Sequence, residues 1–80
     1  MKDSERNADA IIFEERIRIA FIEAIGQSGL SQRDVAKKAF ITDASLSDYI
    51  HKNKLPSLIT FARICRAIDV SADDILGLSD

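Results

Sequence analysis

The fold of this chain is decided by residues 29–50, which read GLSQRDVAKKAFITDASLSDYI. Two short helices are predicted here, each beginning directly after a residue whose side-chain oxygen caps a helix N-terminus. Ser31 precedes a helix over Gln32–Ala39, and Thr42 precedes a helix over Asp43–Ile50. The gap between the two helices is so short that they must turn sharply against each other, as in a helix-turn-helix.

Two further helix starts follow the same capping logic. Ser57 is the expected N-cap of a fourth helix. Ser71 and Asp74 form a capping box like that of Ser31 and Asp34, in which each side chain accepts a hydrogen bond from the other residue's backbone N–H. Ser71 therefore opens a last helix of one or two turns. Its apolar anchors are Ile75 and Leu76.

The remaining helix is the first one, over Asp9–Gln27, and residues 1–7 before it are predicted to be disordered. Apolar residues with helical spacing mark the buried faces of the longer helices. In the first helix these are Phe13, Ile17, Ala20, Phe21 and Ala24. In the third they are Leu46, Tyr49 and Ile50, and in the fourth Leu58, Phe61, Ala62, Ile64, Cys65 and Ile68. The sequence thus predicts one all-α domain of five helices over residues 1–80.

Size and composition exclude several functional classes. A chain of 80 residues and 8.9 kDa has room for one domain and no deep substrate pocket. Cys65 and His51 are the only residues of their types, which argues against a disulfide, a metal site and a nucleophile–base pair. We expect no enzyme, no cofactor and no small-molecule substrate. No apolar run approaches the ~20 residues of a membrane span, and the polar start is no signal peptide, so a cytoplasmic protein is expected.

The net charge of −2 is distributed unevenly. Residues 1–30 carry −2 and residues 67–80 carry −4, whereas residues 31–66 contain seven basic and three acidic side chains and carry +4. A basic centre between acidic ends is a suitable footprint for nucleic acid. On the charge pattern alone, a solvated helix face is the favoured interpretation, so the charge does not decide the function.

Together with KNKLPSLITFARICRAIDVSADDIL at residues 52–76, the opening stretch resembles the lambda-repressor/Cro-type helix-turn-helix family of bacterial and phage regulators. The resemblance covers residues 16–76 and rests on many spaced positions. They include the entry Gly29–Gln32, the small pair Val35 and Ala36, the anchor Leu46, and the segments 56–58 and 67–71. It implies a five-helix lambda-repressor-like bundle that binds double-stranded DNA.

The resemblance also implies which residues contact DNA. The helix over residues 43–50 would enter the major groove, while the start of the preceding helix and the following loop would contact phosphates. The implied phosphate contacts are Gln32, Lys52, Asn53, Lys54 and Ser57. The implied base contacts are Thr42, Asp43, Ala44, Ser47 and Asp48. For Gln32 and Ser57 simple helix capping is the competing interpretation, and for the lysines solvation of a loop.

Some positions depart from the family pattern. Phe40 stands where the family usually has glycine in the turn, so either the turn is rebuilt or Phe40 accepts strain in exchange for burial. Lys52 replaces another frequent glycine. An ion pair common in the family becomes the apolar pair Ile25 and Ile50, a replacement that need not lower stability. Asp43 and Asp48 are acidic on the base-reading face, where a carboxylate can accept from the amino group of cytosine but mostly repels phosphate.

Two functions from different classes remain. The first is a sequence-specific transcriptional regulator that represses by occupying an operator. The alternative is a protein-interaction module on the same scaffold, such as the antitoxin of a toxin–antitoxin pair or a helix-turn-helix that no longer binds DNA. The acidic recognition helix favours the alternative, whereas the capped helix at Gln32 and the loop with Lys52 and Lys54 favour DNA binding.

The first helix carries a second apolar stripe outside its core face. At 100° per residue, its members lie together on roughly the opposite side of the helix. They are Ile11, Ile12, Ile19 and Ile22. Four isoleucines in one stripe on a small domain predict a homodimer interface, unless the last helix with Leu76 and Leu78 covers them.

Overall fold

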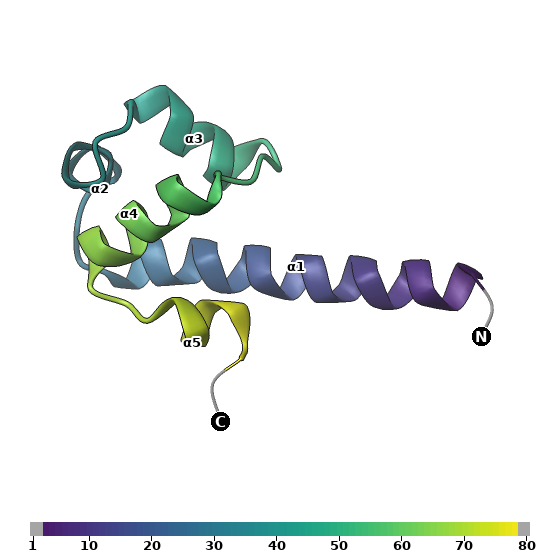
Figure 1. The fold of residues 1–80 in the computed structure, drawn as a ribbon. Helices are drawn as coiled ribbons and strands as arrows, with labels where there is room; N and C mark the ends of the chain where they lie inside the picture. The colour runs from purple at the N-terminus through teal and green to yellow at the C-terminus, as the bar shows by residue number, and fades with distance from the viewer. Residues whose placement is uncertain (1–2, 79–80) are drawn as a thin grey trace.

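The computed structural model describes residues 3–78, which form five helices and no strand (Figure 1). The helices are α1 Asp3–Gln27, α2 Gln32–Lys38, α3 Asp43–His51, α4 Leu58–Ile68 and α5 Ala72–Leu76. The predicted all-α, five-helix architecture is therefore confirmed, with α2 and α3 ending within one residue of the predicted positions. α1 begins at Asp3 instead of the predicted Asp9. The predicted disorder of residues 1–7 stays a prediction, and residues 1 and 2 lie outside the described range.

A single apolar core joins all five helices. Leu46 of α3, Ile64 of α4 and Val35 of α2 are its most deeply buried large side chains. The other members are Phe21, Ile25, Ala36, Ala39, Cys65, Ile68 and Ile75. The rings of Phe21 and Phe61 meet with their centroids 5.7 Å apart and tilted by 50°, which connects α1 to α4. The pair Val35 and Ala36 lies in the core, as the sequence indicated.

α1 is much longer than the elements that pack on it. Figure 1 shows α4 and α5 against its C-terminal half, while its N-terminal half extends beyond the rest of the domain. Residues 8–16, here called the overhang, are all exposed. The molecule measures 45 × 29 × 20 Å, and the projecting helix accounts for this elongated shape.

Three residues predicted for the core are exposed. Phe13 is exposed because it lies on the overhang, where only the edge of α5 approaches it. Leu58 and Ala62 lie outside the buried face of α4, which is formed by Ile64, Cys65 and Ile68. At about 100° per residue, Leu58 points roughly 70° away from the middle of that face and Ala62 roughly 110° away. The spacing alone made the buried stripe too broad.

The predicted N-caps are present, but the two predicted capping boxes are not complete. Ser31, Thr42 and Ser57 are N-caps whose side chains accept a backbone N–H three residues later. At Ser31 this is the only half of the capping box that forms, since the Asp34 carboxylate accepts no hydrogen bond from the Ser31 N–H. Ser71 is also an N-cap, but its side chain makes no capping hydrogen bond, so the predicted capping box at Ser71 is wrong. α5 is held by apolar packing instead, since Ile75 is buried.

Candidate nucleic-acid interface

The first feature of the candidate interface is the start of α2. The backbone N–H of Asp34 donates to Ser31 Oγ at 3.1 Å, which fixes the first turn. Gln32 follows as the first helical residue, and its side chain is exposed. The side-chain amide of Gln32 therefore carries both a donor and an acceptor at the surface, next to the unpaired N–H groups of a helix start.

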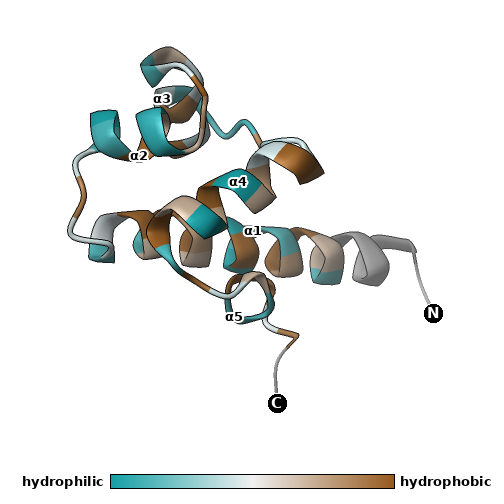
Figure 2. Ribbon diagram, turned by 60° about the vertical axis from the view of Figure 1, so that its left-hand side comes forward, coloured by the Kyte–Doolittle hydropathy of each residue, from teal (hydrophilic) through white to brown (hydrophobic). Residues whose placement is uncertain are grey.

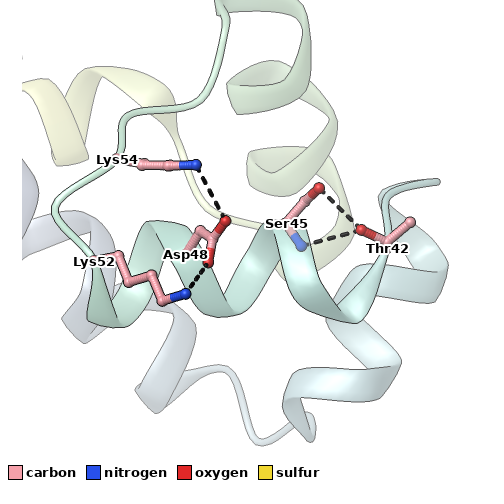
Figure 3. Close-up of polar contacts among 5 residues, drawn as sticks. All are labelled: Thr42, Ser45, Asp48, Lys52 and Lys54. Carbon is pink, nitrogen blue, oxygen red and sulfur yellow. Dashed lines mark hydrogen bonds and ion pairs between the residues drawn. The ribbon is translucent and has the colours of Figure 1, made fainter.

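The second feature is the outer face of α3. At its start, the N–H of Ser45 donates to Thr42 Oγ1 at 3.0 Å, and the Thr42 hydroxyl donates to Ser45 Oγ at 2.9 Å (Figure 3). Asp43 and Ala44, which lie between these two residues in the sequence, are exposed. Leu46 points in the opposite direction, into the core. The buried side of α3 thereby fixes which residues it presents outward.

Asp48 on this outer face forms ion pairs with both nearby lysines. Its Oδ1 lies 3.5 Å from Lys52 Nζ, one turn further along α3, and its Oδ2 lies 3.4 Å from Lys54 Nζ in the following loop (Figure 3). The lysine side chains are 72% and 65% exposed, whereas that of Asp48 is 27% exposed. The carboxylate therefore holds two mobile cations beside the outer face of α3.

The loop between α3 and α4 reverses the chain without glycine. Lys52 has φ −119°, so its side chain causes no strain where the family often has glycine. Asn53 takes the left-handed conformation instead, with φ 57°, which asparagine tolerates better than most residues. Ser57 then caps α4 as Thr42 caps α3: its Oγ accepts the N–H of Thr60 at 3.2 Å and its hydroxyl donates to Thr60 Oγ1 at 3.0 Å.

The turn between α2 and α3 retains the geometry that favours glycine. The N–H of Ile41 donates to the carbonyl of Ala36 at 3.0 Å and that of Phe40 to Lys37 at 3.3 Å, which is a Schellman motif. Phe40 has φ 59°, a conformation that costs an L-residue about 1–2 kcal/mol. Its side chain is 75% exposed. The expectation that Phe40 exchanges strain for burial is therefore wrong: the strain is present and the ring faces solvent.

Of the predicted DNA-contact residues, the structure brings Asp48, Lys52 and Lys54 together through their ion pairs. The whole set belongs to the start of α2, to α3, to the loop after it and to the start of α4, and all its members are exposed or partly exposed. The predicted dimer residues lie on α1, where Ile22 lines one shallow pocket with Gln32. Ile11, Ile12 and Ile19 are exposed, and Ile22 is partly buried. α5 lies on a different side of α1, against Ile17 and Ala20, so Leu76 and Leu78 do not cover this stripe.

Sequence reasoning missed a second apolar surface. Figure 2 shows hydrophobic residues at the start of α4. Leu55, Leu58 and Ile59 are all more than half exposed there. Leu55, Pro56 and Leu58 line a shallow groove against α1, together with Ile17 and Phe61. Ile59 lies outside this groove, on the side of α4 opposite its buried face. Leu58 was predicted as core because its spacing continues the apolar pattern of α4.

Comparison with known families decides what this arrangement is. A family model described as helix-turn-helix matches residues 22–75, which span the end of α1 through α5. The chain belongs to the lambda-repressor/Cro-type helix-turn-helix family. It therefore carries a DNA-binding helix-turn-helix domain, with α2 and α3 as the paired helices. No significantly similar protein was found among curated sequences or solved structures.

Two departures from the helix-turn-helix pattern are accommodated in the packing. Ile25 is buried and Ile50 partly buried, and both line one shallow pocket with Ile22 and Leu30. An apolar contact thus stands where the family often has an ion pair. Cys65 is buried as expected, and this burial raises the pKa of its thiol. Of the helices described, none is long and apolar enough to cross a membrane.

Proposed function

We propose that this helix-turn-helix chain is a bacterial or phage transcriptional repressor that acts in the cytoplasm by occupying an operator in double-stranded DNA. The observation that carries the proposal is the outer face of α3. Asp43 and Ala44 are exposed on it, and Lys52 and Lys54 flank it at one end. An exposed helix with cations beside it suits insertion into a groove lined by phosphates.

In this proposal α3 reads bases from its first two turns. Asp43 and Ala44 lie at the leading end, where Ala44 is suited to a thymine methyl group and Asp43 to the amino group of cytosine. Ser47 lies one turn later on the same side. Thr42 is the nearest hydroxyl, but its proton is already donated to Ser45, so it would offer a base mainly its methyl group and oxygen. Asp48, although on the same face, acts mainly by holding the two lysines.

The phosphate contacts fall on both sides of α3. Gln32 would contact one strand from the start of α2. Lys52, Asn53 and Lys54 would contact the other from the loop, together with Ser57 at the capped start of α4. These contacts fix the position of α3 and carry no sequence information of their own. The local charge of +4 over residues 31–66 supports this assignment, although the whole chain is acidic.

Binding to DNA over a range of salt concentrations tests the proposal. Lys54→Ala should weaken binding to every sequence alike and flatten the plot of log affinity against log salt by about one unit. Gln32→Ala should also weaken binding to all sequences alike, but it should change the salt slope less because no charge is lost. Ala44→Ser should instead change the preferred sequence. A wild-type chain without salt-dependent DNA binding at low ionic strength would refute the repressor assignment.

We also propose that the repressor is a homodimer paired through α1. Ile11, Ile12 and Ile19 are 63%, 57% and 47% exposed on a helix that projects from the body of the domain. Isolated exposed isoleucines are ordinary, but a stripe of them on a projecting helix is typical of an interface. A symmetric pair would place two copies of α3 for two half-sites about 34 Å apart.

Light scattering tests the dimer. The wild type should be dimeric at micromolar concentrations, and Ile19→Glu should be monomeric because it places a charge in the centre of the stripe. Gln27→Glu also adds a carboxylate at an exposed position of α1, but about 110° from the middle of the stripe and two turns beyond Ile19, so it is the matched control and should remain dimeric. A monomeric wild type, or a dimeric Ile19→Glu variant, contradicts the proposed interface.

A second candidate function is a protein-interaction module, such as an antitoxin. The apolar surface at the start of α4 favours it, since Leu55, Leu58 and Ile59 expose more apolar surface than a phosphate-facing helix start needs. Leu58→Ser discriminates the two functions. If the chain is a repressor, the variant should bind DNA within about twofold of the wild type. If the chain is an interaction module, the wild type should bind no DNA, and the variant should lose the partner protein that the wild type binds.

A further inference from the structure

The starting observation is a strained residue that the folded domain does not need. Phe40 adopts φ 59°, yet its side chain is 75% exposed. The other left-handed residues that follow helices in the described range are of more tolerant types: Gly29, Asn53, Asp69 and Gly77. The packing of the domain therefore provides no compensation for the strain at Phe40. Strain of this kind is found where a residue is held for function.

The surroundings of Phe40 indicate the chemistry of what it meets. It lies two residues before Thr42, so its Cα is at most about 8 Å from the start of α3. Lys37 and Lys38 in the last turn of α2 precede it and are exposed. No acidic residue occurs between positions 35 and 42. An exposed ring with two adjacent cations, at the leading end of the recognition helix, suits DNA better than an apolar protein surface.

We propose that Phe40 is an additional DNA-contact residue, whose ring packs on a thymine methyl group beside the base pairs read by α3. This inference rests on the proposed function and assigns part of its sequence preference. Aromatic and aliphatic side chains recognise thymine through this methyl group, which protrudes into the major groove. Lys37 and Lys38 would bind the phosphates next to the same base pair. The left-handed turn is what directs the ring away from the core and toward the DNA.

The test separates the ring from the strain. Phe40→Gly removes both, so the variant should unfold at an equal or higher denaturant concentration than the wild type. It should nevertheless bind the duplex most enriched by selection from a random library at least about fivefold more weakly. The salt slope should stay unchanged, because no charge is removed. Phe40→Leu keeps an apolar side chain and should lose less affinity.

The thymine is identified by a chemical substitution in the duplex. Replacing the thymines of the selected site one at a time by deoxyuridine removes only the methyl group. One such replacement per half-site should weaken binding of the wild type at least threefold and leave binding of Phe40→Gly unchanged. That interaction between protein variant and DNA variant is specific to a direct contact.

Each other outcome overturns the inference. If Phe40→Gly binds the selected duplex as tightly as the wild type does, Phe40 makes no such contact. The same conclusion follows if the variant loses the same affinity for duplexes with the thymine methyl groups and for duplexes without them. If the variant becomes monomeric while its isolated half-site affinity is unchanged, the ring belongs to a protein interface instead. If the wild type itself binds no DNA, the proposed function fails and this inference fails with it.

Discussion

Replacing Asp48 by asparagine tests how an acidic recognition helix binds DNA. In the free chain, the Asp48 carboxylate lies 3.5 Å from Lys52 Nζ and 3.4 Å from Lys54 Nζ. Asp48→Asn keeps the size of the side chain and removes its charge. The formal net charge changes from −2 to −1, and that of residues 31–66 from +4 to +5. Both lysines then lose the ion pairs that compete with phosphate.

The stability cost should be small. All three side chains are at least partly exposed, so solvent screens the two ion pairs, and such pairs contribute about 0–1 kcal/mol each. We expect the free energy of unfolding to fall by less than about 1 kcal/mol, as measured by urea denaturation. The fold should therefore be intact in the binding experiment.

The binding effect is larger and has a definite sign. If one additional phosphate is neutralised, the slope of log affinity against log salt becomes steeper by about 0.9. Over the fourfold range from 50 to 200 mM salt, the variant should then lose about three- to fourfold more affinity than the wild type loses. At 50 mM it should bind more tightly to all sequences. Fluorescence anisotropy with a labelled duplex measures both quantities.

The result that refutes this reasoning is a change of preference without a change of slope. Asp48 would then accept a hydrogen bond from a cytosine amino group, and its removal would weaken one base pair only. Asp73→Asn is the control, because Asp73 is exposed on α5, on the other side of α1 from α3, and the loss of its charge should leave the salt slope unchanged.

The remaining predictions concern the core. Leu46→Ala should lower the free energy of unfolding by about 3–5 kcal/mol, because Leu46 is completely buried. Leu46→Met should lower it by less than about 1.5 kcal/mol, and urea denaturation of both variants measures the difference. The Cys65 thiol should react with an aromatic disulfide reagent far more slowly in the native chain than in urea, since burial raises its pKa and blocks access, and equal rates would contradict this. Because the pKa is higher in the folded state, this thiol should favour folding at neutral pH and lose that contribution as the pH rises through the alkaline range, which denaturation at increasing pH measures.

Most of the fold followed from local signals. The serine and threonine caps predicted where α2, α3 and α4 begin, since a side-chain oxygen three residues before a free N–H determines a helix start directly. The core anchors Leu46 and Ile64 followed from helical spacing. These features depend on neighbours in the sequence, and neighbours are visible without a structure.

The errors came from tertiary features. Phe13 follows the core spacing of α1, but the rest of the domain ends before reaching most of its surface. Leu58 continues the apolar pattern of α4, although no element covers that side. At the candidate nucleic-acid interface, polar and charged residue types predicted side chains that are exposed or partly exposed in the structure. The pairing of Asp48 with two lysines depends on the path of the loop after α3, and so does not follow from the sequence.

The overhang of α1 has a consequence for how the chain responds to its own concentration. Only the edge of α5 approaches this segment, at Phe13 and Arg16, and a helical segment with so little tertiary packing is only marginally stable in water. Its backbone hydrogen bonds therefore gain most of their protection from hydrogen exchange when a partner packs on it. If a second copy packs on Ile11 and Ile12, ordering of this segment and pairing of the chains become one linked equilibrium. Amide hydrogen exchange in residues 8–16 should then slow as the protein is concentrated. Operator occupancy should likewise rise more steeply than the amount of protein, so that a small change in synthesis or degradation switches the target gene.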